Sequence, residues 1–344
     1  HAGVPGCGRA PPSGHRGSAR LNGFSWRVST SGGMRGDPGR DTNVSRPRTG
    51  PPANRRLHRL RGPASEECPG LPRPPLSDLV CTRLVDLGLA RGTDAYRRFV
   101  VVTWYRSGSN YLRELLAAGP GVVAYSEVFS PKGPFWGGLR HAPWISPARA
   151  RAERLRAPLE FLDRWVFRPQ PRGTLAVGFK VMTPQLVEKP VPGLLERLRD
   201  DGRLRLVLLY RRNLYHQLVS SRLSHATLQT SARSRRAIER AQAAVVPFAP
   251  APAECEAFFT SLTARLAWCR DALPRERTVE IAYEELGGDG LARVQDHIGV
   301  PRHDGTARVL RQRTRPVHEH VANHAALAAH FRGTRWAPFF AAEE

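Results

Sequence analysis

The sequence predicts an α/β fold, in which a parallel sheet is flanked by helices. Short apolar runs alternate along the chain with segments of helical periodicity. A polar turn that contains glycine joins the first apolar run to the first helix of the core, and charged residues recur where the runs end. Because alternating strands and helices form a doubly wound parallel sheet, ligands are expected at the carboxyl ends of the strands.

The first strand is predicted at residues 99–102, where three of the four residues are β-branched. Further strands are expected at residues 121–129, 174–182, 204–210 and 278–283. Helices are expected at residues 76–89, from 111 onward, and at 148–166, 193–199, 213–226, 254–273 and 291–298. Pro158 is expected to kink or split the third of these helices, and Asn213 is a good cap for the helix that follows it.

Residues 1–75 are predicted to be a disordered tail, and residues 76–344 to form the folded α/β domain. The tail has 12 proline and 13 glycine residues, and 13 arginines against 4 acidic residues. It has few large apolar side chains, so it cannot bury enough surface to offset the entropy lost on ordering.

The net charge of +23 would ordinarily suggest a nucleic-acid partner. Only 3 of the 53 basic residues are lysine, however, and this skew is typical of a GC-rich genome. No nucleic-acid-reading module accompanies the charge, so nucleic-acid binding is not expected. A smaller anion, such as a nucleotide or an acidic glycan, remains a suitable ligand.

The five cysteines are scattered, and no pair has the spacing of zinc ligands. Free thiols are typical of a reducing compartment, so a cytoplasmic location is expected. No apolar run is long enough for a transmembrane segment, and the histidine and aspartate residues offer no metal-ligand set.

A candidate anion site follows the first strand. Arg106 supplies a permanent charge, Gly108 lets the backbone approach an anion, and the helix that begins here points its N–H groups at the same place. Further donors come from Ser107, Ser109 and Asn110. The turn lacks the lysine of the nucleotide-triphosphatase loop, and a plain structural connection is the alternative.

A second candidate anion site follows the strand at 204–210. This strand leads through Arg211 and Arg212 into a helix with a polar stripe, formed by Asn213, Gln217, Ser220, Ser221 and Ser224. Arg212 and Ser220 could clasp one phosphate between them. The alternative is that the arginines are solvated charges and the serines an exposed face.

Together these segments resemble the sulfotransferase family. Residues 103–110 resemble its 5'-phosphosulfate loop, T-x-P-[RK]-[ST]-G-[ST], and residues 208–220 resemble its 3'-phosphate motif. The bacterial carbohydrate branch, of the nodulation-factor and trehalose type, is the most similar, and the resemblance covers roughly residues 98–336. Other matching segments are 125–129, 178–182, 281–286, 311–315, 321–323 and 333–334. The chain departs from the pattern at Tyr105, where proline is usual, and at Asn213, where aspartate is more common.

The resemblance implies a P-loop-like sulfotransferase fold and the donor 3'-phosphoadenosine 5'-phosphosulfate (PAPS). The sulfuryl group would pass in line to a hydroxyl of a carbohydrate or glycolipid acceptor, and no metal is required. The resemblance also implies how the residues act. Arg106 and the N–H groups of residues 107–110 would hold the 5'-phosphosulfate, and Arg212 and Ser220 the 3'-phosphate. Arg313 would close over the donor, Glu127 would be the general base, and Lys180 would contact the sulfonate or the substrate.

Two other functions remain open at this point. A kinase-like nucleotide-phosphate transferase would also use such a loop, but it would need paired acids for magnesium. A non-catalytic basic module that binds anions through the arginines of residues 1–75 is the other alternative. The sequence leaves the acceptor and the oligomeric state, a homodimer included, undecided.

Overall fold

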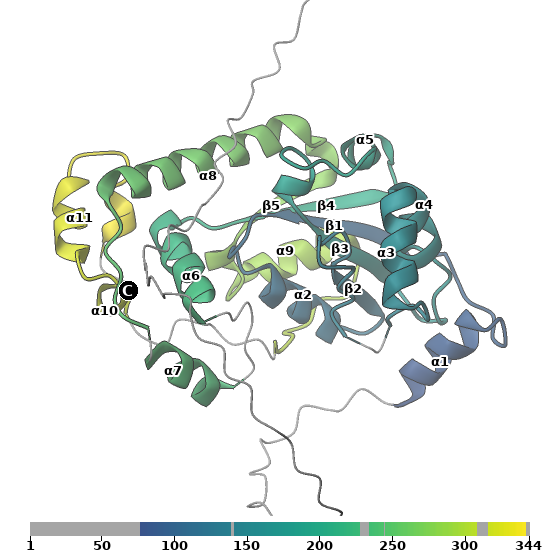
Figure 1. Cartoon of the computed structure of the whole chain (residues 1–344). Coiled ribbons are helices and arrows are strands. Elements are labelled where there is room, and N and C mark those ends of the chain that lie inside the picture. Colours follow the sequence, from purple (N-terminus) through teal and green to yellow (C-terminus); the bar gives the residue numbers. More distant parts are fainter. Residues whose placement is uncertain (1–75, 139–140, 228–233, 244, 308–315, 342–344) are drawn as a thin grey trace, which may run out of the picture. The chain divides into compact units, whose positions relative to one another are not determined.

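The computed structural model describes residues 76–138, 141–227, 234–243, 245–307 and 316–341. The predictions for residues 1–75 and for Arg313 fall outside these ranges. The described chain contains a five-stranded sheet whose neighbouring strands all pair in parallel. Helices flank this sheet (Figure 1), so the predicted fold class is confirmed.

The strands lie in the order β2-β3-β1-β4-β5, which puts the first strand at the centre of the sheet. Their bounds are β1 Arg97–Thr103, β2 Val122–Glu127, β3 Ala176–Met182, β4 Leu204–Tyr210 and β5 Thr278–Ala282. Each strand overlaps a predicted one, and β4 has the predicted bounds. Because all five run in one direction, their carboxyl ends meet at one edge, where the loops of the candidate site begin.

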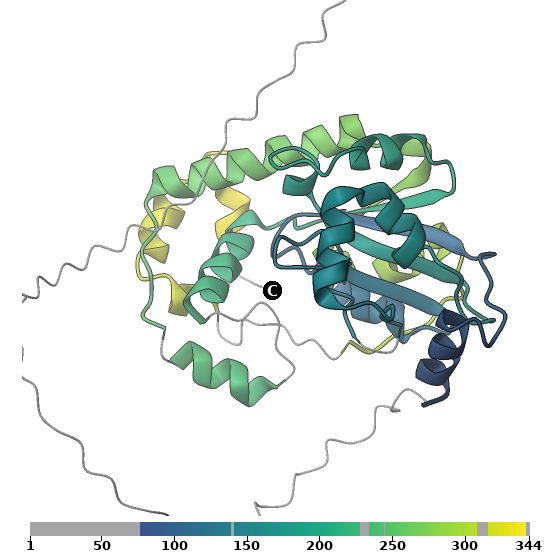
Figure 2. The ribbon, with the colours of Figure 1, turned by 45° about the vertical axis from the view of Figure 1, so that its right-hand side comes forward.

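Each face of the sheet carries its own hydrophobic core. On one face, α2 (Ser109–Ala118) and α9 (Asp289–Ile298) pack against alternate residues of the strands, among them Val101 and Leu209. The opposite face is covered by α5 (Leu194–Asp200), α8 (Pro252–Ala272) and a π-helical turn at Leu162–Val166. Figures 1 and 2 show α8 lying along one side of the sheet and continuing beyond it.

Where α8 extends beyond the sheet, a third core forms. Aromatic side chains of α8 and the carboxyl-terminal segment pack there against α6 (Leu214–Thr227), with Phe259 at the centre of the ring contacts. Short helices complete this part of the chain: α7 Arg235–Ala243, α10 Val317–His320, α11 His324–His330 and a 3-10 turn at Ala337–Phe340. The sequence analysis did not anticipate these short helices.

Pro158 splits the helical stretch that precedes β3, as predicted. Helix α3 (Pro147–Arg156) begins after the cap Ser146, whose side chain accepts a hydrogen bond from the N–H of Arg149. Helix α4 (Pro158–Phe161) starts at the proline itself. Proline fits the first position of a helix because the N–H it lacks would have no partner within that helix.

The edge strand β2 contains one extra residue relative to its partner β3. Ala124 lies opposite Gly178, and the next matched pair is Glu127 with Lys180, so β2 advances three residues while β3 advances two. Side chains of a strand alternate between faces, so this bulge moves Glu127 from the face of Tyr125 to the face of α2. The register of the sheet thus brings Glu127 beside Lys180.

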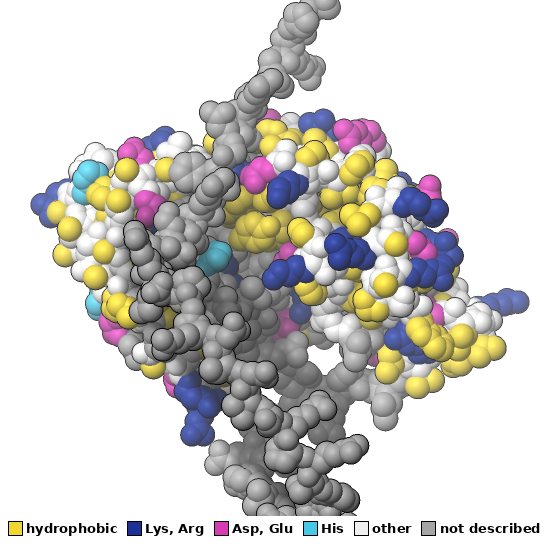
Figure 3. All heavy atoms as spheres, viewed as in Figure 1, with side chains coloured by type: hydrophobic (Ala, Val, Ile, Leu, Met, Phe, Trp, Pro, Cys, Tyr) yellow, Lys and Arg dark blue, Asp and Glu magenta, His cyan; other side chains and the backbone are white. Residues whose placement is uncertain are grey.

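The remaining described segments include α1 (Leu76–Asp86) and 3-10 turns at Thr183–Gln185, Arg275–Arg277 and Tyr283–Glu285. Figure 3 shows lysine and arginine side chains spread among acidic and hydrophobic ones over the visible face. None of the helices described is both long and apolar enough to cross a membrane. Of the described cysteines, Cys81 is exposed, Cys255 and Cys269 are buried, and all three are free thiols.

Candidate active site

The loop between β1 and α2 has the backbone shape that its sequence predicts. Gly108 caps α2 with a φ of 82°, and a Cβ atom at this position would lie 2.1 Å from Cδ2 of Tyr283. Only glycine fits under this ring. Arg106 also has a positive φ, 66°, and it is the sole non-glycine residue in the described chain that does. Such a conformation costs an L-residue about 1–2 kcal/mol, so surrounding contacts must hold it.

Arg106 joins the two candidate anion sites. Its Nε donates a hydrogen bond of 3.1 Å to Oγ of Ser220 on α6. Burial and, to a lesser extent, the charge of Arg211 lower the pKa of the Arg106 guanidinium to about 10, against an opposing effect of Tyr283. The fold therefore places partly buried positive charge where the loop and α6 meet, which is a favourable arrangement for an anion.

Lys180 connects the amino end of α2 to Glu127. Its Nζ lies 2.6 Å from Oδ1 of Asn110, 3.4 Å from Oγ of Ser109 and 3.2 Å from Oε1 of Glu127. The side chain is only 3% exposed, so the lysine is not a solvated residue at a strand end. Burial lowers its pKa, an effect that Glu127 opposes. A buried ammonium held by three acceptors is well placed to set the position of the carboxylate.

Glu127 is fixed by its backbone as well as by this ion pair. Its carbonyl oxygen accepts hydrogen bonds from the N–H groups of Ser130 (3.2 Å) and Phe135 (3.0 Å). Burial raises the pKa of Tyr105, and the charges of Glu127 and Glu188 raise it further. The exposed ring of Tyr105 thus lies within electrostatic reach of the carboxylate.

The comparisons with known proteins agree with this geometry. No protein-family model matches the chain. Nodulation protein H of Rhizobium meliloti is 28% identical over 252 residues, which is 71% of this chain and 95% of the relative. Nodulation protein H of Rhizobium tropici is 27% identical over 249 residues, which is 70% of this chain and 92% of the relative. These similarities support the resemblance to the bacterial nodulation-factor sulfotransferase family.

A solved structure also aligns with most of this chain. The crystal structure of a sulfotransferase from Alicyclobacillus acidocaldarius aligns with 71% of this chain and 93% of its own, at 16% identity and a TM-score of 0.37. A score this low does not establish a shared fold. The α/β assignment rests instead on the strand order and the parallel register of the sheet.

The two arginines after β4 point to different partners. The Arg212 side chain is 58% exposed and pairs with Glu285, while Ser220 accepts its hydrogen bond from Arg106. The Arg211 side chain is 8% exposed, its guanidinium lies 5.0 Å from the ring centre of Tyr283, and its Nε is 3.7 Å from Glu284. The structure therefore brings Arg211 close to Arg106 and turns Arg212 toward solvent.

The alternation of side chains in β4 predicts which face of the sheet Arg211 occupies. Val207 and Leu209 face α2 and α9, so the residue two positions further extends to the same face. That face carries the amino end of α2. The sequence analysis used the spacing from Arg212 to Ser220 instead, and spacing alone does not say where an exposed side chain turns.

Helix α6 begins as predicted. Oδ1 of Asn213 accepts a hydrogen bond from the N–H of His216 at 2.9 Å, and Nδ2 of Asn213 donates to the carbonyl of Phe339 at 3.1 Å. Asparagine therefore serves as the cap at a position where aspartate is more common. The helix places its polar stripe beside the loop, with Gln217 inside the protein and Ser220 partly exposed.

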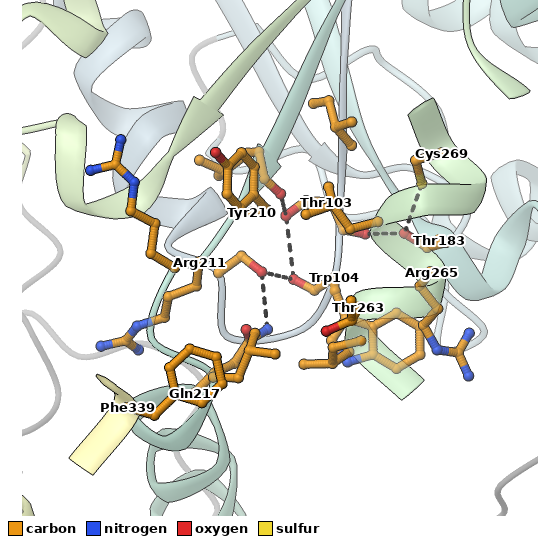
Figure 4. Close-up of a pocket in the computed structure, with 17 residues that line it drawn as sticks. Thr103, Trp104, Thr183, Tyr210, Arg211, Gln217, Thr263, Arg265, Cys269 and Phe339 are labelled. Carbon is orange, nitrogen blue, oxygen red and sulfur yellow. Dashed lines mark hydrogen bonds between the residues drawn. The ribbon is translucent and has the colours of Figure 1, made fainter. Parts of the chain in front are cut away.

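A cavity of about 170 Å³ lies beside the loop, between the end of β4, α6 and α8 (Figure 4). The figure shows Thr183 and Cys269 on one side of it and Arg211 on the other. Arg265 lies 4.2 Å from the ring centre of Trp104 and pairs with Glu188. Within the ranges that the structure describes, no group of three or more His, Cys, Asp or Glu side chains could hold a metal ion.

Three tryptophans between β2 and β3 differ in their surroundings. Trp136 stacks on Phe161 and contacts Tyr125 edge to face, so it is part of the core. Nε1 of Trp165 donates to Glu153. Trp144 is exposed, and the guanidinium of Arg83 lies 5.9 Å from its ring centre.

Proposed function

We propose that this protein transfers a sulfuryl group from PAPS to a hydroxyl of a carbohydrate or glycolipid acceptor. The observation that supports the proposal best is the contact between Arg106 and Ser220. It joins the loop expected to hold the 5'-phosphosulfate to the helix expected to hold the 3'-phosphate. A donor with phosphates at both positions matches such a paired site, because each phosphate then meets buried positive charge or helix N–H groups.

In this proposal the donor is held from both ends. The N–H groups of residues 107–110 and the guanidinium of Arg106 bind the 5'-phosphosulfate, and Ser109 adds a hydroxyl. Ser220 binds the 3'-phosphate together with an arginine of the doublet at 211 and 212. Arg313, which lies outside the described residues, closes over the donor.

The transfer step needs a base and stabilisation of negative charge. The oxygen of the acceptor hydroxyl forms a bond to sulfur, while the bond from sulfur to the bridging oxygen of the 5'-phosphate breaks. The hydroxyl proton passes to the carboxylate of Glu127, and the products are a sulfate ester and 3'-phosphoadenosine 5'-phosphate. Arg106 and the amino end of α2 stabilise the departing phosphate.

Lys180 has two effects in this step. Its ion pair with Glu127 holds the carboxylate at the end of β2, where it can accept the proton of the acceptor hydroxyl. Its contacts with Ser109 and Asn110 place the same positive charge at the amino end of α2, next to the expected sulfonate. The lysine therefore ties the position of the base to that of the donor.

Binding of the desulfated donor tests the proposal directly. The full chain is expected to bind 3'-phosphoadenosine 5'-phosphate at least about tenfold more tightly than AMP, because only the former has the second phosphate. Isothermal titration calorimetry with both nucleotides measures the difference. Equal affinity for the two, or no binding of either, would contradict a PAPS site.

The arginine doublet offers a matched pair of variants for the same titration. Arg211→Ala is expected to weaken binding of 3'-phosphoadenosine 5'-phosphate about tenfold or more, since a buried guanidinium binds phosphate strongly. Arg212→Ala is expected to weaken it less than about threefold, because an exposed charge is screened by solvent. The reverse order would show that Arg212 leaves Glu285 to bind the phosphate, as its spacing from Ser220 indicates.

A further inference from the structure

Gln217 is a buried polar residue that contacts the loop from α6. It is 2% exposed, and its Nε2 donates to the carbonyl oxygen of Tyr105 at 2.7 Å and to Oγ of Ser107 at 3.1 Å. Ser107 in turn donates to the carbonyl oxygen of Trp104 at 3.0 Å. Figure 4 shows Gln217 near Trp104, with the two bonds that connect them through the Ser107 hydroxyl drawn as dashed lines. The glutamine thus binds the chain at two points of one tight turn.

These two points lie on either side of Arg106, the residue with the left-handed backbone. A strained conformation persists only where neighbouring contacts fix it. The bonds from Gln217 to residues 105 and 107 fix the chain directly before and directly after Arg106.

The side chain of Arg106 is held by the same helix. Gln217 and Ser220 are three residues apart, so they lie on one side of α6. Ser220 accepts from the guanidinium of Arg106, while Gln217 binds the backbone carbonyl of the residue before it and the hydroxyl of the residue after it. Helix α6 therefore contacts three consecutive residues of the loop.

We propose that Gln217 is a positioning residue that holds Arg106 in its left-handed conformation and so keeps the two phosphate sites in register. This inference rests on the proposed function, because the phosphate sites are those of the PAPS donor. Gln217 does not need to touch the donor for this role. By fixing the loop on both sides of Arg106, it sets the direction in which the Arg106 side chain points.

The test compares Gln217→Met with the matched variant Gln295→Met. Gln295, on α9, is 1% exposed, donates to the carbonyl of His303 at 2.9 Å and accepts from its N–H at 3.3 Å. Both variants lose two hydrogen bonds at a buried site and are expected to lower the thermal unfolding midpoint by similar amounts. Only Gln217→Met is expected to weaken binding of 3'-phosphoadenosine 5'-phosphate, by about tenfold.

A double-variant cycle separates positioning from general destabilisation. If Gln217 acts through Arg106, adding Gln217→Met to Arg106→Ala causes no further loss of affinity. Full additivity of the two losses, or an equal loss in Gln295→Met, would overturn the inference. If Gln217→Met does not fold, Gln217→Glu replaces it. Glutamate keeps the shape of the side chain but places a carboxylate against the carbonyl of Tyr105. The same loss of affinity, and the same lack of a further loss in the Arg106→Ala background, are then expected.

The unmodified protein serves as the reference for the proposed function. If it binds 3'-phosphoadenosine 5'-phosphate in preference to AMP and Gln217→Met binds equally well, the positioning role is wrong while the PAPS site stands. If the unmodified protein shows no such preference, both proposals fail together.

Discussion

Arg106→Ala is expected to reduce the affinity for 3'-phosphoadenosine 5'-phosphate about a hundredfold, the largest loss of any single substitution in the donor site. Arg106 is the residue at which the loop, Ser220 and Arg211 come together. Its removal takes away a charge-assisted hydrogen bond donor in a partly buried place, where water cannot replace it fully. Titration calorimetry measures the loss, and an affinity within about threefold of the unmodified protein would exclude Arg106 from the site.

The same variant should not be less stable than the unmodified protein. The pKa of Arg106 is lowered in the folded state, which means that folding disfavours the charged form. Below pH 10 the charged guanidinium therefore reduces the stability of the fold, and its removal relieves this cost. An unchanged or raised thermal unfolding midpoint together with lost binding would identify Arg106 as a residue kept for function. A large drop in the midpoint would instead assign it a structural role.

Glu127→Gln is expected to lower kcat for sulfuryl transfer by about 10² to 10⁴, the range typical of a lost general base. Glutamine has nearly the same shape as glutamate but cannot accept the proton of the acceptor hydroxyl. Binding of 3'-phosphoadenosine 5'-phosphate should change little, because Glu127 is not among the residues expected to hold the phosphates. Transfer of labelled sulfate from PAPS to a panel of oligosaccharides measures the effect.

The control for this variant is Glu254→Gln. Glu254 on α8 is as exposed as Glu127, 25% in both cases, and it also pairs with a basic residue, Arg222. Neutralising it removes an ion pair that involves neither the loop nor Lys180 and whose basic partner is 37% exposed, so kcat should stay close to that of the unmodified protein. A loss of kcat in Glu254→Gln equal to that in Glu127→Gln would mean that the loss reflects a weakened ion pair rather than a missing base.

The parts of the fold that the sequence predicts are those with a strong local signal. β1 contains the apolar run at residues 99–102 and β4 the apolar run at residues 206–209, and such runs are typical of strands buried on both faces. The split at Pro158 and the cap at Asn213 follow from the chemistry of single residues. Helices α10 and α11 are short and include several histidines, so their hydrophobic periodicity is too brief to recognise.

The candidate site is only partly predictable for a different reason. Which residues gather at the edge of the sheet follows from strand direction, but the partner of each long side chain depends on the tertiary structure. Lys180 could have been a solvated lysine, and only the position of α2 above β3 shows that it is buried against Asn110. Arg106 and Ser220 are likewise 114 positions apart, so their contact cannot be predicted from a local sequence pattern.

The extra residue in β2 decides which side chain of this strand stands beside Lys180. If β2 and β3 stayed in simple register, Ser126 would stand opposite Lys180, and Glu127 would turn to the face that carries Tyr125. A hydroxyl cannot serve as the proton acceptor at neutral pH. Whether a carboxylate stands beside Lys180 thus depends on the number of residues between Ala124 and Glu127 as well as on the residue types. A chain shorter by one residue here could keep every phosphate contact and still be unable to catalyse the transfer.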